Sequence, residues 1–191
     1  MRQDTHETLV TIGYIIAGLV GAGLSGIILT RNSLWHQPAV LASFLTIGFA
    51  GALIYAAVRL RGFGFALMMI VLLFFSQVAL QPPLRATSAI SAAIRALPIG
   101  VAFCTAAYLF KAIPKVPVGR FPLMALLVGG AHSLVVVLAG AWRQRPVPMA
   151  LLVPMAVEGA LVGGLMGLGF ELIDLLRPRK GEPDWHAVVG H

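Results

Sequence analysis

The chain has 191 residues, of which 59% are hydrophobic and only 11% are charged, whereas an ordinary soluble domain is roughly 45–50% apolar and about 25% charged. This composition, with a mean hydropathy of +0.91, excludes a typical soluble domain and indicates one membrane domain with short tails. The formal net charge of +7 would suggest nucleic acid as the partner of a soluble protein. Here the basic residues lie mainly in loops between apolar segments, so we expect membrane lipids and no nucleic acid as partners.

Six apolar segments follow one another along the chain. A helix needs about 20 apolar residues to cross a hydrocarbon core roughly 30 Å thick. The segments show no alternation of the kind found in barrel strands, and a span must satisfy its own backbone, so each predicts a helix. In chain order they cover residues 9–30, 39–58, 62–80, 86–110, 121–142 and 148–176. The sequence therefore predicts an all-α integral membrane bundle of six helices.

Two polar tails flank this domain. Residues 1–8 carry two acids and precede a long apolar stretch, which is typical of a retained first span rather than a signal peptide. Residues 177–191 are polar and contain Pro178 and Pro183, so we expect a flexible basic tail.

The basic residues at the span ends predict the orientation. Nine lie on one side of the expected bundle, namely Arg2, Arg59, Arg61, Lys111, Lys115, Arg120, Arg177, Arg179 and Lys180. Four lie on the other side, namely Arg31, Arg85, Arg143 and Arg145. The positive-inside rule then places both termini in the cytoplasm, and we expect a bacterial inner membrane. Trp35 and Trp142 fall at the expected outer boundaries, where indole rings favour the headgroup region.

Small residues recur at every fourth position in the first and last segments. These ridges are Gly18, Ala22 and Gly26 in the first segment, and Gly159, Gly163 and Gly167 in the last. Residues four apart share a helix face, and small ones let two helices approach closely in lipid. The ridges either pack the bundle internally or dock a partner protein or a second copy of the chain.

Two opposite charges lie deep within the expected spans. A charge at the centre of a bilayer costs about 2.5–3.5 kcal/mol on insertion scales, so such a side chain faces the protein interior and is a candidate functional residue. At 1.5 Å of rise per residue, Arg95 and Glu158 lie roughly 13 and 15 Å below the outer boundary. Equal depth predicts that they form an ion pair.

His132 and Gln77 are candidates for the same polar region. His132 lies near the middle of the fifth segment and can bond a backbone carbonyl, Ser133 or Glu158. Gln77 lies near the outer end of the third segment. The four residues either fix the register of the helices or line a polar pocket that opens outward. Glu171 and Asp174 are expected to be interfacial, with Asp174 pairing locally with Arg177 or with the bases that flank Pro178.

The sequence contains no familiar catalytic or cofactor motif. A phosphate-binding loop, a dinucleotide-binding fingerprint in the required context and an HExxH zinc motif are all absent. Cys104 stands alone in an apolar segment and is interpreted as a small buried hydrophobe. We therefore expect no enzyme activity, no cofactor and no bound metal.

Two functional classes remain open. In the first, the protein binds or transports a small polar or anionic solute through the pocket around Arg95, His132 and Glu158. In the second, it is a non-catalytic structural or assembly subunit that docks through its glycine-rich faces, as a homo-oligomer or with other membrane subunits. The buried charges favour the first class. The size and span count are similar to those of small substrate-binding membrane subunits of transporters, which is an analogy of architecture only.

Overall fold

A computed structural model describes residues 2–29, 38–79, 86–112 and 119–176. Within these ranges, the side chains of residues 2–6, 38–40, 63, 76–79 and 86–88 are not described. The described residues form six helices and no strand: α1 (Arg2–Leu29), α2 (Pro38–Leu60), α3 (Phe63–Ala79), α4 (Ala86–Ala112), α5 (Arg120–Trp142) and α6 (Met149–Leu176). The prediction of an all-α bundle is confirmed.

The described helices begin and end within two residues of the predicted spans, except at the start of α1. Helix α1 begins at Arg2, so most of the segment 1–8, which we expected to be a tail, is helical. No proline or glycine interrupts these residues, so nothing in their sequence breaks a helix. Helices α2 and α3 are joined by a tight turn in which Gly62 has a φ of +101°, a conformation that glycine adopts without steric cost.

Five of the six helices are long and apolar enough to cross a membrane. The exception is α3, whose 17 residues span only about 26 Å at 1.5 Å per residue. Six helices are therefore confirmed, whereas six full spans are supported only in part. Apolar side chains of α3 such as Leu67, Val71 and Phe75 are exposed, which suits contact with lipid.

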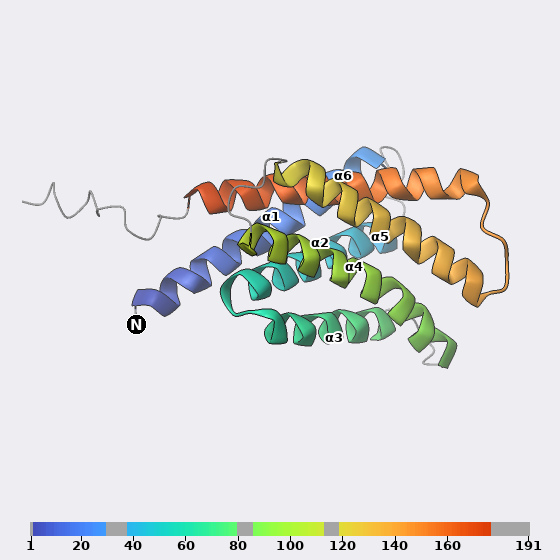
Figure 1. Cartoon of the computed structure of the whole chain (residues 1–191), viewed down its shortest axis with the longest axis horizontal. Coiled ribbons are helices and arrows are strands. Elements are labelled where there is room, and N and C mark those ends of the chain that lie inside the picture. The colour runs from blue at the N-terminus through green and yellow to red at the C-terminus, as the bar shows by residue number, and fades with distance from the viewer. Residues whose placement is uncertain (1, 30–37, 80–85, 113–118, 177–191) are drawn as a thin grey trace, which may run out of the picture.

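Successive helices run in opposite directions along the bundle (Figure 1). Helices α1, α2, α4, α5 and α6 form a closed circuit of neighbours, and α3 packs against α2 and α4. This alternation brings the starts of α1, α3 and α5 to the same end as the ends of α2, α4 and α6 (Figure 1). Side chains far apart in the sequence can therefore meet at either end.

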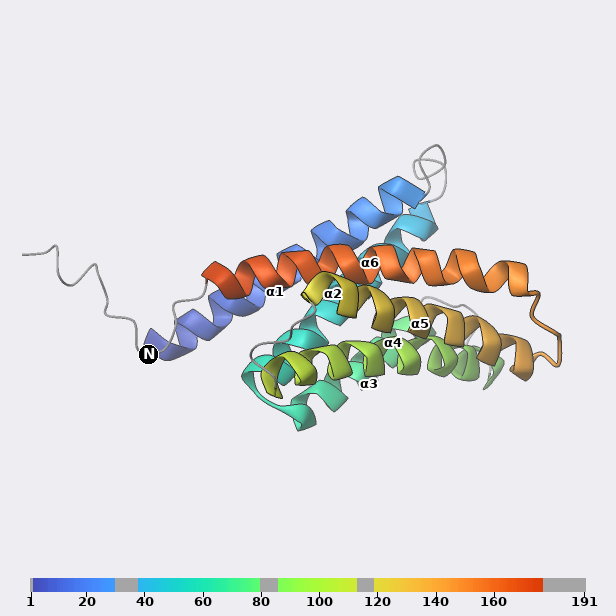
Figure 2. The ribbon, with the colours of Figure 1, turned by 45° about the horizontal axis from the view of Figure 1, so that its top comes forward.

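The small-residue ridges lie inside this bundle. All six predicted ridge residues are buried. A Cβ atom added at Gly18 would lie 2.5 Å from the carbonyl oxygen of Gly48 on α2. The neighbouring Gly21 approaches the backbone of α6 where α1 crosses it (Figure 2), so that an added Cβ would lie 2.8 Å from the nitrogen of Met166. The α6 ridge faces α5 in the same way, so both ridges pack helices of the same chain.

Two adjacent glycines of α5 offer a direct test of this packing. A Cβ added at Gly129 would lie 2.8 Å from the carbonyl oxygen of Ala156 on α6, whereas one added at Gly130 would meet nothing within 4 Å. We expect Gly129→Ala to lower the free energy of unfolding by about 1–3 kcal/mol through overpacking. Gly130→Ala is the matched control, and helix propensity alone should make it neutral or slightly stabilising. Unfolding in mixed detergent micelles measures both, and equal effects would contradict the close α5–α6 approach.

Candidate functional site

A cavity of about 480 Å³ lies among α2, α3, α4, α5 and α6, at the end of the bundle where α5 leads into α6. Its walls include the ionisable residues Arg95, His132 and Glu158, one from each of α4, α5 and α6. The remaining walls are mainly apolar and include Ile47, Leu73, Ala96, Ile99, Val135, Val136, Leu151 and Met155. Three of the four predicted polar candidates therefore line one cavity. The fourth, Gln77, lies on α3, but its side chain is outside the described part of the structure.

Arg95 and Glu158 share the cavity without forming the ion pair that we expected. In the described part of the chain, the ion pairs within 4.0 Å join Arg59 and Arg120 to Asp174, and none joins Arg95 to Glu158. The Arg95 side chain is exposed and Glu158 is partly exposed. Counting residues gave their depths but not the directions in which the two helices face, so both side chains line the cavity without pairing. Each charged group is therefore available to a ligand.

His132 is held by its own helix. Its ring is buried and its Nδ1 lies 2.9 Å from the carbonyl oxygen of Val128. Because a carbonyl only accepts, Nδ1 carries the proton, and in the neutral ring Nε2 is an acceptor. A backbone carbonyl is one of the three partners that we predicted for His132. Gly159 of α6 makes room for the ring, since a Cβ there would lie 2.6 Å from Nδ1.

The loop between α5 and α6 places two more arginines at the rim of the cavity. Arg143 and Arg145 both line the cavity and are exposed. Between them, Gln144 has a φ of 51°, and the amide nitrogens of all three residues donate to carbonyl oxygens in the last turn of α5. With Arg95, these residues give the cavity more positive than negative charge, which attracts anionic groups.

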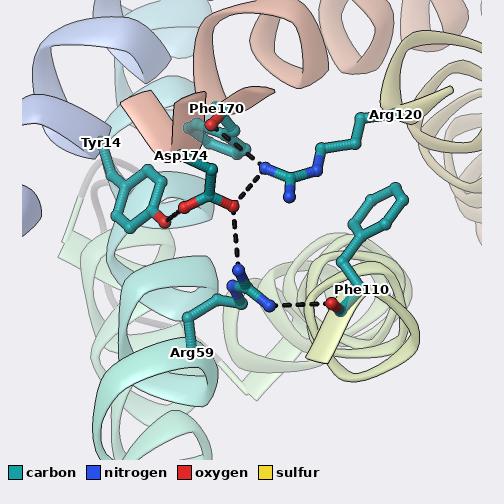
Figure 3. Close-up of polar contacts among 6 residues, drawn as sticks. All are labelled: Tyr14, Arg59, Phe110, Arg120, Phe170 and Asp174. Carbon is teal, nitrogen blue, oxygen red and sulfur yellow. Dashed lines mark hydrogen bonds and ion pairs between the residues drawn. The ribbon is translucent and has the colours of Figure 1, made fainter. Parts of the chain in front are cut away.

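The opposite end of the bundle contains a cluster of charges around Asp174 of α6. Figure 3 shows its carboxylate between Tyr14 of α1, Arg59 of α2 and Arg120 of α5. Tyr14 donates to one carboxylate oxygen, and both arginines donate to the other, Arg59 across 2.9 Å. The side chain of Asp174 is only 10% exposed, compared with 17% for Arg59 and 19% for Arg120. One carboxylate thus joins four helices.

Further contacts extend the cluster to α4. Arg59 donates to the carbonyl oxygen of Phe110 across 2.8 Å, and the guanidinium of Arg120 lies 5.1 Å from the centre of the Phe110 ring (Figure 3). Tyr14 of the cluster also contacts two aromatic rings. Tyr55 stacks on Phe170 with a centroid separation of 4.3 Å, and the Tyr14 ring meets both of them edge-on. Aromatic contacts and ion pairs therefore join the helices at this end of the bundle, whereas the cavity lies at the other end.

Sequence reasoning missed this cluster. It assigned Asp174 to a local pair with Arg177 or the bases that flank Pro178, which lie outside the described residues. The structure instead pairs Asp174 with Arg59 and Arg120. A signal was present, because the alternating directions of six helices put the ends of the second and sixth segments beside the start of the fifth. Cys104 is a buried free thiol, as expected.

The fold and the two polar regions define a class of protein. It is a helical membrane protein with a polar cavity at one end and an ion-pair cluster at the other. Among the described residues, no group of three or more histidine, cysteine, aspartate or glutamate side chains could hold a metal ion. Comparisons with protein-family models, curated proteins and solved structures found no match for the chain.

Proposed function

We propose that this protein binds a small polar or anionic solute in the cavity lined by Arg95, His132 and Glu158, and carries it across a bacterial inner membrane. In this proposal the protein is not an enzyme, and both termini lie in the cytoplasm. The observation that carries the proposal is the gathering of three intramembrane ionisable side chains, from three helices, around one cavity.

The dimensions and chemistry of the cavity support binding of a small molecule. Its volume of about 480 Å³ falls within the range of roughly 300–1,000 Å³ found for ligand pockets. Its walls combine a mainly apolar surface with a few polar groups, which is the usual composition of such sites. Ionisable residues at membrane depth commonly mark solute or ion pathways.

The two ends of the bundle differ in a way that suits transport. The cavity reaches exposed residues at the α5–α6 loop, whereas the Asp174 cluster joins five helices at the other end. A carrier must expose its site to one side while the other side is closed. With the orientation expected from the loop charges, the cavity opens to the outside and the Asp174 cluster closes the cytoplasmic end.

The alternative function is that of an assembly subunit that docks through glycine-rich faces. Such a subunit would have to dock through a surface other than the predicted ridges. The predicted ridges on α1 and α6 are buried against other helices of the same chain.

Ligand binding by charge variants tests the proposal. We expect Arg95→Gln and Glu158→Gln each to weaken binding of the co-purified solute about tenfold or more, because each removes a charge from the cavity. The matched controls are Arg61→Gln, an exposed arginine at the α2–α3 turn, and Glu171→Gln, which lies on the same helix as Glu158. Both controls should bind normally.

Native mass spectrometry after gentle detergent extraction identifies the solute and its copy number. Ligand-induced shifts in thermal unfolding then compare the variants. The proposal is wrong if no small molecule accompanies the protein and none from a broad solute panel stabilises it. It is also wrong if the cavity variants and the controls bind equally well.

A further inference from the structure

The cavity contains two opposite charges, and neither has a side-chain partner in the part of the chain that the structure describes. Arg95 on α4 and Glu158 on α6 both line it, and among the described residues neither forms a hydrogen bond or an ion pair with another side chain. A charge in a mainly apolar environment is costly without a counter-charge. If the two groups served only to fix the bundle, direct pairing would relieve that cost for both of them. Because the two groups line one cavity without pairing within 4.0 Å, the cavity offers a positive and a negative binding group at the same time.

We propose that the solute is a zwitterion with an apolar body, whose carboxylate binds Arg95 and whose ammonium binds Glu158. This inference rests on the proposed function and names the substrate class of that site. Free amino acids with apolar side chains and short apolar peptides belong to this class. A simple anion would satisfy Arg95 but would be repelled by Glu158, and a simple cation would meet the reverse difficulty.

The other polar groups of the cavity fit the same ligand. The guanidinium of Arg95 can form two parallel hydrogen bonds to a carboxylate. An ammonium has three protons to donate, and the acceptors nearby are the carboxylate of Glu158 and, in the neutral ring, Nε2 of His132. His132 is held with Nδ1 on the carbonyl oxygen of Val128, so its acceptor nitrogen is the one left for a ligand.

The apolar walls and the rim complete the assignment. Ile47, Ile99 and Met155 come from three different helices and offer surface for an apolar body. Arg143 and Arg145 stand at the rim, where they attract the carboxylate end of an approaching ligand. The carboxylate would then reach Arg95 with the ammonium trailing toward Glu158.

The test compares four charge forms of the same compounds. Leucine, phenylalanine, tryptophan and leucyl-leucine are each used as the zwitterion, the N-acetylated anion, the amide cation and the doubly blocked neutral form. Binding is measured by thermal unfolding and isothermal titration on the purified full-length protein in detergent. At least one zwitterion is expected to bind about tenfold or more tightly than both of its singly charged forms, which corresponds to one lost charge contact.

Each of the two cavity variants should remove one of the zwitterion's two preferences and leave the other. Glu158→Gln should remove the advantage of the zwitterion over the N-acetylated anion and leave its advantage over the amide. Arg95→Gln should do the opposite, and Glu171→Gln should retain both preferences. A merely structural role for the two charges would change all four forms together.

The outcomes separate the two proposals. If N-acetylated anions bind as tightly as the zwitterions, or if the co-purified molecule lacks either charge, the zwitterion assignment is wrong and solute binding stands. If every panel compound fails and nothing co-purifies, both proposals fail. Charge-form preferences that are unchanged by Glu158→Gln also overturn the assignment.

Discussion

Replacing Asp174 by alanine is expected to lower the free energy of unfolding by about 3 kcal/mol, because it leaves two partly buried arginines without their shared counter-charge. Arg59 and Arg120 are only 17% and 19% exposed. The same change also removes the acceptor of the Tyr14 hydroxyl. Reversible unfolding in mixed detergent micelles gives the difference directly.

Glu171→Ala is the matched control for this prediction. Glu171 lies on the same helix, one turn before Asp174, and is also partly exposed. Exposed surface charges contribute about 0–1 kcal/mol, so this variant should remain close to the wild type. A loss below about 0.5 kcal/mol for Asp174→Ala would mean that the cluster is a surface feature and does not hold the helices together.

Asp174→Ala also separates the two ends of the bundle. The cavity lies at the other end and contains none of the residues of the Asp174 cluster. Provided that the variant is studied below its unfolding temperature, it should still bind the solute. If the cluster closes the cytoplasmic end of a transport path, as we propose, the same variant should show leak or altered uptake in proteoliposomes.

The helices could be predicted from the sequence because each depends on local composition. A run of apolar residues in lipid must be helical, and the predicted spans match the observed helices closely apart from the start of α1. The exception shows what hydropathy does not detect. The polar residues after Met1 lie outside an apolar run, and yet nothing in their sequence breaks a helix.

For the candidate site, the sequence indicated how far along its helix each ionisable residue lies but not which way its side chain faces. Counting residues along the spans led us to group Arg95, His132 and Glu158 in one polar region, and all three line the cavity. The direction in which each helix faces depends on long-range packing, which the sequence does not show. The expected Arg95–Glu158 pair is therefore absent.

The Asp174 cluster was missed for the same reason. Its ion pairs join Asp174 to residues 115 and 54 positions away, and reasoning from neighbours in the sequence favours a local partner instead.

Small-residue ridges show a similar ambiguity. Their spacing predicts close helix contacts, but it does not tell whether the second helix belongs to the same chain.

Gly163→Leu settles that last ambiguity and is expected to have a severe effect on stability. A Cβ at this position would lie 2.7 Å from the Cβ of Val128 and would also meet the carbonyl oxygen of Met124 on α5. Neither a backbone oxygen nor a β-carbon can move far, so α5 and α6 must separate. We expect a loss of about 3 kcal/mol or more, at the upper end of the range for overpacking, with poor recovery of monodisperse protein.

The control is Gly130→Leu, which adds the same side chain to α5 where nothing lies within 4 Å. It should remain folded, since an added leucine there can project away from the bundle.

If the ridge on α6 were instead a docking face for another subunit, Gly163→Leu would leave the isolated chain as stable as wild type and would abolish only its association. Unfolding of the purified chain and size-exclusion chromatography of the native membrane extract therefore give opposite results under the two interpretations. The burial of Gly163 against α5 predicts the first result, loss of folding by the chain itself.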